Sequence, residues 1–108
     1  MKNANVFVDV DLTLVDANGS LLEGAREALQ RLKDAGCHLF LWSTAGVDYA
    51  RSVAARHQLM PLFEGFAAKP DIVIDDMPST ATAPFVFNVQ EEPSWKALCD
   101  KIIARHLG

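Results

Sequence analysis

Short apolar runs alternate with amphipathic segments along the chain. The first run, residues 5–10, is rich in β-branched and aromatic side chains, which predicts a strand covered on both faces. Residues 38–42 predict a second buried strand. Two amphipathic helices are also predicted, one ending at Gly36 and one ending near His57. Their apolar positions recur at helical spacing, as Ala25, Ala28, Leu29, Leu32 and Ala35 in the first helix and Val47, Ala50, Val53 and Ala54 in the second.

The later part of the chain continues this alternation. Residues 71–74 and 85–89 are two more short apolar runs that predict strands. A last helix follows, with Pro93 near its start and one apolar face made of Trp95, Leu98, Cys99, Ile102 and Ile103. Such an alternation is typical of an α/β sandwich with a mostly parallel sheet. We expect Trp42 and Trp95 to belong to the core.

The segment before residue 71 limits the topology. Only Lys69 and Pro70 separate residues 65–68 from the strand at 71–74, whereas a parallel crossover usually takes about a dozen residues. We therefore expect residues 62–68 to be a connector over the end of the sheet. The 71–74 strand should then lie beside the first strand and the 85–89 strand beyond it. The direction of that last strand is open, because the connection from Asp76 to Phe85 is short.

Composition narrows the class of protein. A chain of 108 residues that is 50% hydrophobic can form one core, so a single domain over residues 1–108 is expected. A net charge of −4 argues against nucleic acid as a partner. Cys37 and Cys99 match no zinc spacing and indicate reduced thiols. No signal pattern and no apolar run near ~18 residues is present, so we expect a cytoplasmic protein without membrane association.

Paired acids follow two of the predicted strands. Asp9 and Asp11 are two residues apart and should project together from the carboxyl end of the first strand. Asp75 and Asp76 end the 71–74 strand, which the predicted topology places beside the first. A cluster of carboxylates needs a cation, and oxygen ligands favour Mg²⁺. The alternative, that acids merely begin solvated loops, explains one Asp better than two pairs.

Polar residues at the same end of the sheet suggest a phosphate site. Ser43 and Thr44 precede a helix N-terminus, whose N–H groups attract anions. Taken alone, the pair is more often an ordinary N-cap. Lys69 would add a positive charge beside the acids, although an isolated Lys usually faces solvent.

The order of these parts resembles the haloacid dehalogenase (HAD) superfamily. Asp9, Asp11 and Thr13 resemble its first motif, DxDxT; Ser43, Lys69-Pro70 and Asp75-Asp76 resemble the second, third and fourth. The resemblance implies that Asp9 is the nucleophile and Asp11 the general acid and base. It further implies that Ser43 donates to phosphate and that Lys69 steadies phosphate and nucleophile. Mg²⁺ would be held by the Asp9 carboxylate, the Asp11 carbonyl and Asp76, with Asp75 supporting.

The resemblance also implies a three-layer sandwich with a Rossmann-like core. Neither interval that can carry a cap domain, residues 14–22 or 43–69, is long enough for one. Leu12 stands where the family commonly has Gly, and we expect Leu to form the same turn if its side chain packs. The helix that normally separates the third and fourth motifs is missing. The HAD core would therefore be shortened at that point, and the short intervals at 14–22 and 43–69 would make it capless.

The expected function is therefore that of a Mg²⁺-dependent phosphomonoester phosphatase with an aspartyl-phosphate intermediate. Asp11 argues against dehalogenation, which needs no proton for the leaving group. The alternatives are a receiver-like phosphoacceptor and a catalytically silent binding module on the same fold. The substrate would be a phosphorylated small molecule whose site a neighbouring subunit of a homo-oligomer covers, or else a bulky phosphorylated molecule.

Overall fold

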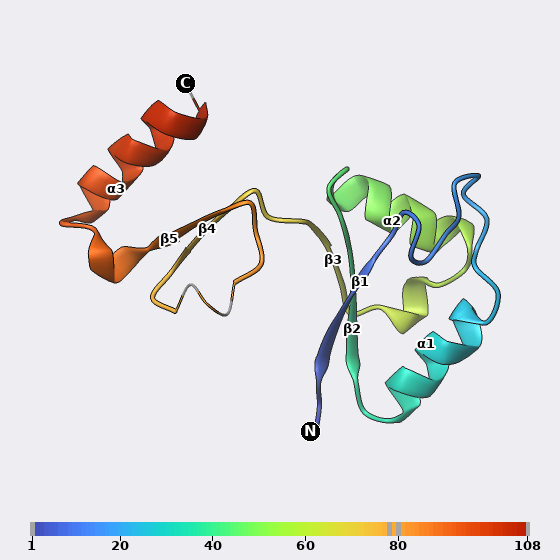
Figure 1. The fold of residues 1–108 in the computed structure, drawn as a ribbon. Helices are drawn as coiled ribbons and strands as arrows, with labels where there is room; N and C mark the ends of the chain where they lie inside the picture. The colour runs from blue at the N-terminus through green and yellow to red at the C-terminus, as the bar shows by residue number, and fades with distance from the viewer. Residues whose placement is uncertain (1, 78, 80, 108) are drawn as a thin grey trace. The chain divides into compact units, whose positions relative to one another are not determined.

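The structure is a computed structural model that describes residues 2–77, 79 and 81–107. It has an α/β fold with short parallel strands in small sheets. The chain divides into two compact units, Met1–Lys69 and Pro70–Gly108, which are described separately below (Figure 1). Among the described residues, no helix combines the length and the apolar character needed to cross a membrane.

The first unit contains a three-stranded parallel sheet in the order β1-β2-β3. Its elements are β1 (Asn5–Asp9), α1 (Ala25–Asp34), β2 (His38–Ser43), α2 (Val47–Arg56), the 3₁₀ turn η1 (Met60–Leu62) and β3 (Gly65–Ala68). Asp9 pairs with Trp42, and Ser43 pairs with Ala68. The carboxyl ends of the three strands therefore lie side by side at the same end of the sheet.

One face of this sheet packs against both helices of the unit. Alternate residues of β2, Leu39 and Leu41, are fully buried in a cluster with Leu29 of α1 and Val53 of α2. The opposite face carries aromatic side chains: Phe7 stacks on Phe40 with ring centroids 4.9 Å apart and lies 4.8 Å from Trp42, yet it is 48% exposed. The described helices of the first unit pack on the other face, so the expected cover over Phe7 stays a prediction.

The two predicted βα units are confirmed, whereas the predicted connector is wrong. The α1 and α2 helices begin and end within a residue or two of the expected positions, and Gly36 follows α1 with a φ of 98°. Residues 65–68 form β3, which pairs in parallel with β2. The spacing argument excluded only a parallel pairing with the strand that follows, and α2 supplies a crossover long enough to reach the far edge of β2.

The second unit contains a two-stranded parallel sheet and a helix. Its elements are β4 (Ile72–Asp75), β5 (Phe85–Asn88), the 3₁₀ turn η3 (Val89–Glu91), α3 (Trp95–Ile102) and the π-helical turn η4 (Ile103–Leu107). The open question about the last strand is answered, since β5 runs parallel to β4. A ladder between β1 and β4 is not among the pairings of the described residues, so that adjacency stays a prediction.

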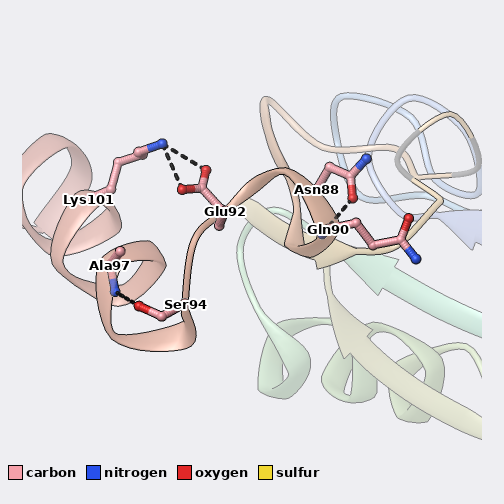
Figure 2. A network of polar contacts seen from close by, with 6 residues as sticks. All are labelled: Asn88, Gln90, Glu92, Ser94, Ala97 and Lys101. Atoms are coloured by element: carbon pink, nitrogen blue, oxygen red, sulfur yellow. Dashed lines mark hydrogen bonds and ion pairs between the residues drawn. The ribbon is translucent and has the colours of Figure 1, made fainter.

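Polar contacts fix the start of α3 (Figure 2). The Ser94 Oγ accepts from the Ala97 N–H at 3.0 Å and caps the helix, as Ser commonly does. The Lys101 Nζ donates to both oxygens of Glu92 at 2.7 and 2.9 Å and so ties the helix to the preceding turn. Trp95 is 64% exposed, so it is not part of a core formed by the second unit alone.

Candidate functional site

The turn after β1 presents Asp9 and Asp11. The carbonyl of the buried Val10 accepts from the N–H groups of Thr13, Leu14 and Val15 at 3.4, 2.9 and 3.1 Å. Three donors on one carbonyl make the chain reverse sharply as it leaves the strand. Leu12 lies in the left-handed region with a φ of 59° and is 75% exposed. The expected turn therefore forms, but without the side-chain packing that we expected to accompany it.

The Asp9 carboxylate, at the end of β1, has partners on both oxygens. The Lys69 Nζ lies 3.2 Å from Oδ1, and the Thr13 hydroxyl donates to Oδ2 at 3.4 Å. The side chains of Asp9 and Lys69 are each 33% exposed, so the pair is accessible to a ligand. Lys69 and Asp9 are thus brought together, as the sequence predicted.

β3 and β2 together position Lys69. The Lys69 N–H donates to the Ser43 carbonyl at 2.9 Å, which continues the β2–β3 pairing beyond the end of β3. The ammonium lies 5.9 Å from the centre of the Trp42 ring, within the range of a cation–π contact. The side chain of Lys69 therefore extends from the end of β3 across Trp42 of β2 to Asp9 of β1.

The Asp11 carboxylate is held by a different element. It is exposed, and its Oδ1 accepts from the hydroxyl of Tyr49 on α2 at 2.6 Å. This hydrogen bond, with a smaller contribution from desolvation, raises the pKa of Tyr49 above its usual 10.0. The phenol is therefore protonated at neutral pH and acts as the donor.

Ser43 and Thr44 lie between β2 and α2. Ser43 is 1% exposed, and its Oγ accepts from the Ala45 N–H at 3.0 Å. The alternative that these residues form an ordinary N-cap is wrong, because the N-cap of α2 is Gly46 and no side chain caps the helix. Gly46 has a φ of 111° and a ψ of 172°, a conformation that is essentially restricted to glycine. The first turn of α2 therefore has no side-chain acceptor at its N-terminus.

The interval after the first motif is a compact hairpin. The Leu22 N–H donates to the Leu14 carbonyl at 3.0 Å, and the Asp16 Oδ1 accepts from the N–H groups of Asn18 and Ser20, each at 2.9 Å. The ring of His57, beyond the end of α2, bonds to the Gly19 carbonyl at 2.9 Å. This interval forms a short flap, as its length predicted.

The fourth-motif acids belong to the second unit. Asp75 ends β4, and its Oδ1 accepts from the Met77 N–H at 2.8 Å; Asp76 is exposed. Their approach to Asp9 remains a prediction. Within the described part of the chain, no group of at least three His, Cys, Asp or Glu side chains is placed to hold a metal ion.

The residues of the first motif nevertheless fit magnesium by their chemistry. Asp9 offers an accessible carboxylate, and Asp11 offers a main-chain carbonyl in the same turn. Mg²⁺ prefers such oxygen ligands, takes only one or two carboxylates and keeps several waters. The donors are therefore of the right kind, and the ligand set would be completed by water, substrate or further acids.

Two contacts of this site were not predicted from the sequence. Tyr49 was missed because only the rotation of α2 about its axis brings its hydroxyl to Asp11. The contact of Lys69 with the Trp42 ring is not visible in the sequence, where Trp42 belongs to an apolar run that indicates only a core position. A signal was present for Tyr49, since a tyrosine in the first turn of a helix that follows a candidate phosphate loop carries a polar tip to the site.

Comparisons of the chain with protein-family models, curated proteins and solved structures found no match.

Proposed function

We propose that this protein is a Mg²⁺-dependent phosphomonoester phosphatase that acts through an aspartyl-phosphate on Asp9. The observation that carries the proposal is the contact between Lys69 and Asp9, with the Lys69 Nζ 3.2 Å from the Asp9 Oδ1. A partly exposed carboxylate beside an ammonium, at the carboxyl end of a parallel sheet, can meet an anionic ester without repelling it. We further propose that residues 1–108 form one capless HAD-like core with a three-layer, Rossmann-like architecture.

In this proposal, Asp9 attacks phosphorus in line and displaces the alcohol. One bond forms between an Asp9 oxygen and phosphorus as the bond to the leaving oxygen breaks, and water then hydrolyses the aspartyl-phosphate. Lys69 keeps the nucleophile in place and offsets negative charge on the phosphoryl oxygens. Phosphoryl transfer depends mainly on such positioning and charge stabilisation.

Asp11 is the proposed acid and base. It protonates the leaving oxygen in the first step and removes a proton from water in the second. Its place two residues after Asp9, in the turn closed on the Val10 carbonyl, keeps it beside the nucleophile without contact to Lys69.

The loop from β2 to α2 is the proposed phosphate-binding segment. The uncapped first turn of α2 offers N–H groups to the phosphoryl oxygens, and the hydroxyls of Ser43 and Thr44 add donors. The Ser43 Oγ accepts from Ala45, and its hydroxyl can still donate its proton to a phosphoryl oxygen.

The proposed Mg²⁺ would be held by the Asp9 carboxylate, the Asp11 carbonyl and Asp76, with Asp75 in support. When bound, it supplies positive charge to the phosphoryl group. The parts assigned to Asp75 and Asp76 rest on the resemblance of the fourth motif, and Asp76→Asn should raise the Mg²⁺ concentration needed for half-maximal activity.

The test is incubation with a small aryl phosphate, with and without Mg²⁺. Continuous turnover that depends on Mg²⁺ is expected; one equivalent or less of product would favour a receiver-like phosphoacceptor, and no product a silent binding module. Asp9→Asn should abolish turnover, whereas Asp34→Asn at the end of α1 should leave it unchanged, since the amide still accepts from Gln30.

The part played by Lys69 is tested by Lys69→Met, which keeps most of the side-chain volume but not the charge. Turnover should fall by about 10²-fold, the usual loss on removal of one charge-stabilising group. Lys96→Met is the matched control, because Lys96 pairs with Asp100 on the exposed surface of α3.

Turnover that continues fully after chelation of the metal would refute the proposal.

A further inference from the structure

Tyr49 joins the core of the first unit to the candidate site. It lies in the first turn of α2, and its ring packs against the buried cluster that contains Leu41, Ala50 and Val53. The hydroxyl leaves this packing and donates to the Asp11 Oδ1 at 2.6 Å. A ring fixed by core packing holds its hydroxyl in a defined place, so it can orient a group that is itself exposed.

Asp11 has the opposite character. It lies in the turn beyond β1 with an exposed side chain, and its carboxylate would rotate freely without a partner. The contacts of the two carboxylates are separate, with Lys69 and Thr13 on Asp9 and Tyr49 on Asp11. Because Tyr49 donates to Oδ1, we assign proton transfer to or from the substrate to Oδ2.

We propose that Tyr49 is a positioning residue that orients the Asp11 carboxylate for proton transfer. This inference rests on the proposed phosphatase function and adds a residue to it. Tyr49 does not touch the reacting atoms; it acts by limiting the orientations of Asp11. Its effect should therefore appear only in steps in which Asp11 moves a proton.

The experiment compares Tyr49→Phe with the unaltered protein on two esters. An alkyl phosphate needs a proton on its leaving oxygen, whereas an aryl phosphate with an acidic phenol does not. The ratio kcat/KM reports the first step alone, so it should fall by about tenfold for the alkyl ester, part of the roughly 10²–10⁴-fold that a positioned acid contributes. For the aryl ester it should stay within about twofold, because Phe keeps the ring packing and Asp9 can still attack.

Two further variants separate positioning from a general structural effect. Ser52→Ala removes another hydroxyl of α2, one that donates to the Tyr49 carbonyl at 2.7 Å and does not contact Asp11, so both ratios should stay unchanged. In an Asp11→Asn background, Tyr49→Phe should cause no further loss on the alkyl ester, because the proton carrier is already absent. Such non-additivity is expected of residues that act as a unit.

The outcomes distinguish the inference from the function on which it rests. Three outcomes would overturn the role of Tyr49 and leave the phosphatase proposal standing. They are an equal loss of kcat/KM on both esters, an unchanged kcat/KM on both esters, and a loss that persists in the Asp11→Asn background. Absence of any turnover by the unaltered protein would overturn the phosphatase proposal itself. Urea unfolding of each variant, compared with the unaltered protein, checks that Tyr49→Phe is folded under the assay conditions.

Discussion

Leu12 adopts a backbone conformation that a leucine rarely takes. Its φ of 59° belongs to the left-handed region, where a Cβ crowds the following carbonyl at a cost of roughly 1–2 kcal/mol. Its exposed side chain gains little from packing in return. The three hydrogen bonds to the Val10 carbonyl hold the residue in this conformation, so the strain is offset by the turn.

Leu12→Gly should therefore stabilise the protein. Removal of the Cβ relieves the strain, and the greater freedom of glycine in the unfolded chain takes back part of the gain, which leaves about 0.5–1 kcal/mol. Thermal unfolding should show a midpoint raised by a few degrees. Leu12→Ala keeps a Cβ and is the control; an equal rise in that variant would attribute the gain to the lost side chain.

The roles proposed for Asp9 and Asp11 predict different effects on the species that accumulates during turnover. Asp11→Asn keeps the main-chain carbonyl and leaves Asp9 able to attack, but the amide can neither protonate an alkoxide nor activate water. Turnover should fall by about 10²–10⁴-fold. With an aryl phosphate the first step is spared, so phosphoenzyme should build up and appear as a mass increase after rapid acid quench. Undiminished turnover of both kinds of ester would favour a purely structural role for Asp11.

At the scale of elements, the sequence predicted what periodicity can express. The α1 and α2 helices were predicted because their apolar residues recur at helical spacing, and strands β1, β2, β4 and β5 because each is a short, continuous apolar run. β3 was not predicted because the two-residue spacing before β4 was applied to every possible partner, whereas β3 pairs with β2, to which α2 supplies the crossover. The contact of Lys69 with Asp9 was predicted from motif order, although the strand that delivers Lys69 was not.

The N-terminus of α3, in the second unit, provides a test of helix capping. The Ser94 Oγ caps α3 by accepting from the Ala97 N–H, and Ser94→Ala removes this acceptor. The free energy of unfolding should fall by about 1 kcal/mol, as is usual for a lost N-cap. Urea unfolding followed by circular dichroism measures the change, and Ser94→Asp, which keeps an acceptor, should retain the stability. Equal midpoints for Ser94→Ala and the unaltered protein would show that the cap contributes nothing.

For the whole molecule, the proposed absence of a cap domain bears on the choice of substrate. The interval from Leu14 to Leu22 is a closed hairpin, and the interval from Ser43 to Lys69 holds α2, η1 and β3. In the proposed mechanism, a site without a lid would leave the phosphoenzyme open to water and would offer little surface for recognition. We therefore expect either a homo-oligomer whose neighbouring subunit covers the site or activity on a bulky substrate.

Light scattering and a panel of phosphorylated substrates test this expectation together. An assembly larger than one chain would support the first alternative, and preference for phosphorylated macromolecules over metabolites the second. A monomer that selects one small phosphorylated metabolite would contradict both. The net charge of −4 makes an acidic polymer an unfavourable macromolecular substrate, so phosphorylated proteins come first in the panel.

The hydrogen bonds to the Val10 carbonyl should slow amide hydrogen exchange in the turn after β1. The N–H groups of Leu14 and Val15 are bound to it at 2.9 and 3.1 Å and belong to fully or almost fully buried residues, so both should exchange with deuterium slowly. If the turn is complete before any metal arrives, Mg²⁺ should leave these two exchange rates nearly unchanged. The candidate ligand-binding turn would then be as protected as the core beside it, a site formed by folding rather than by its ligand.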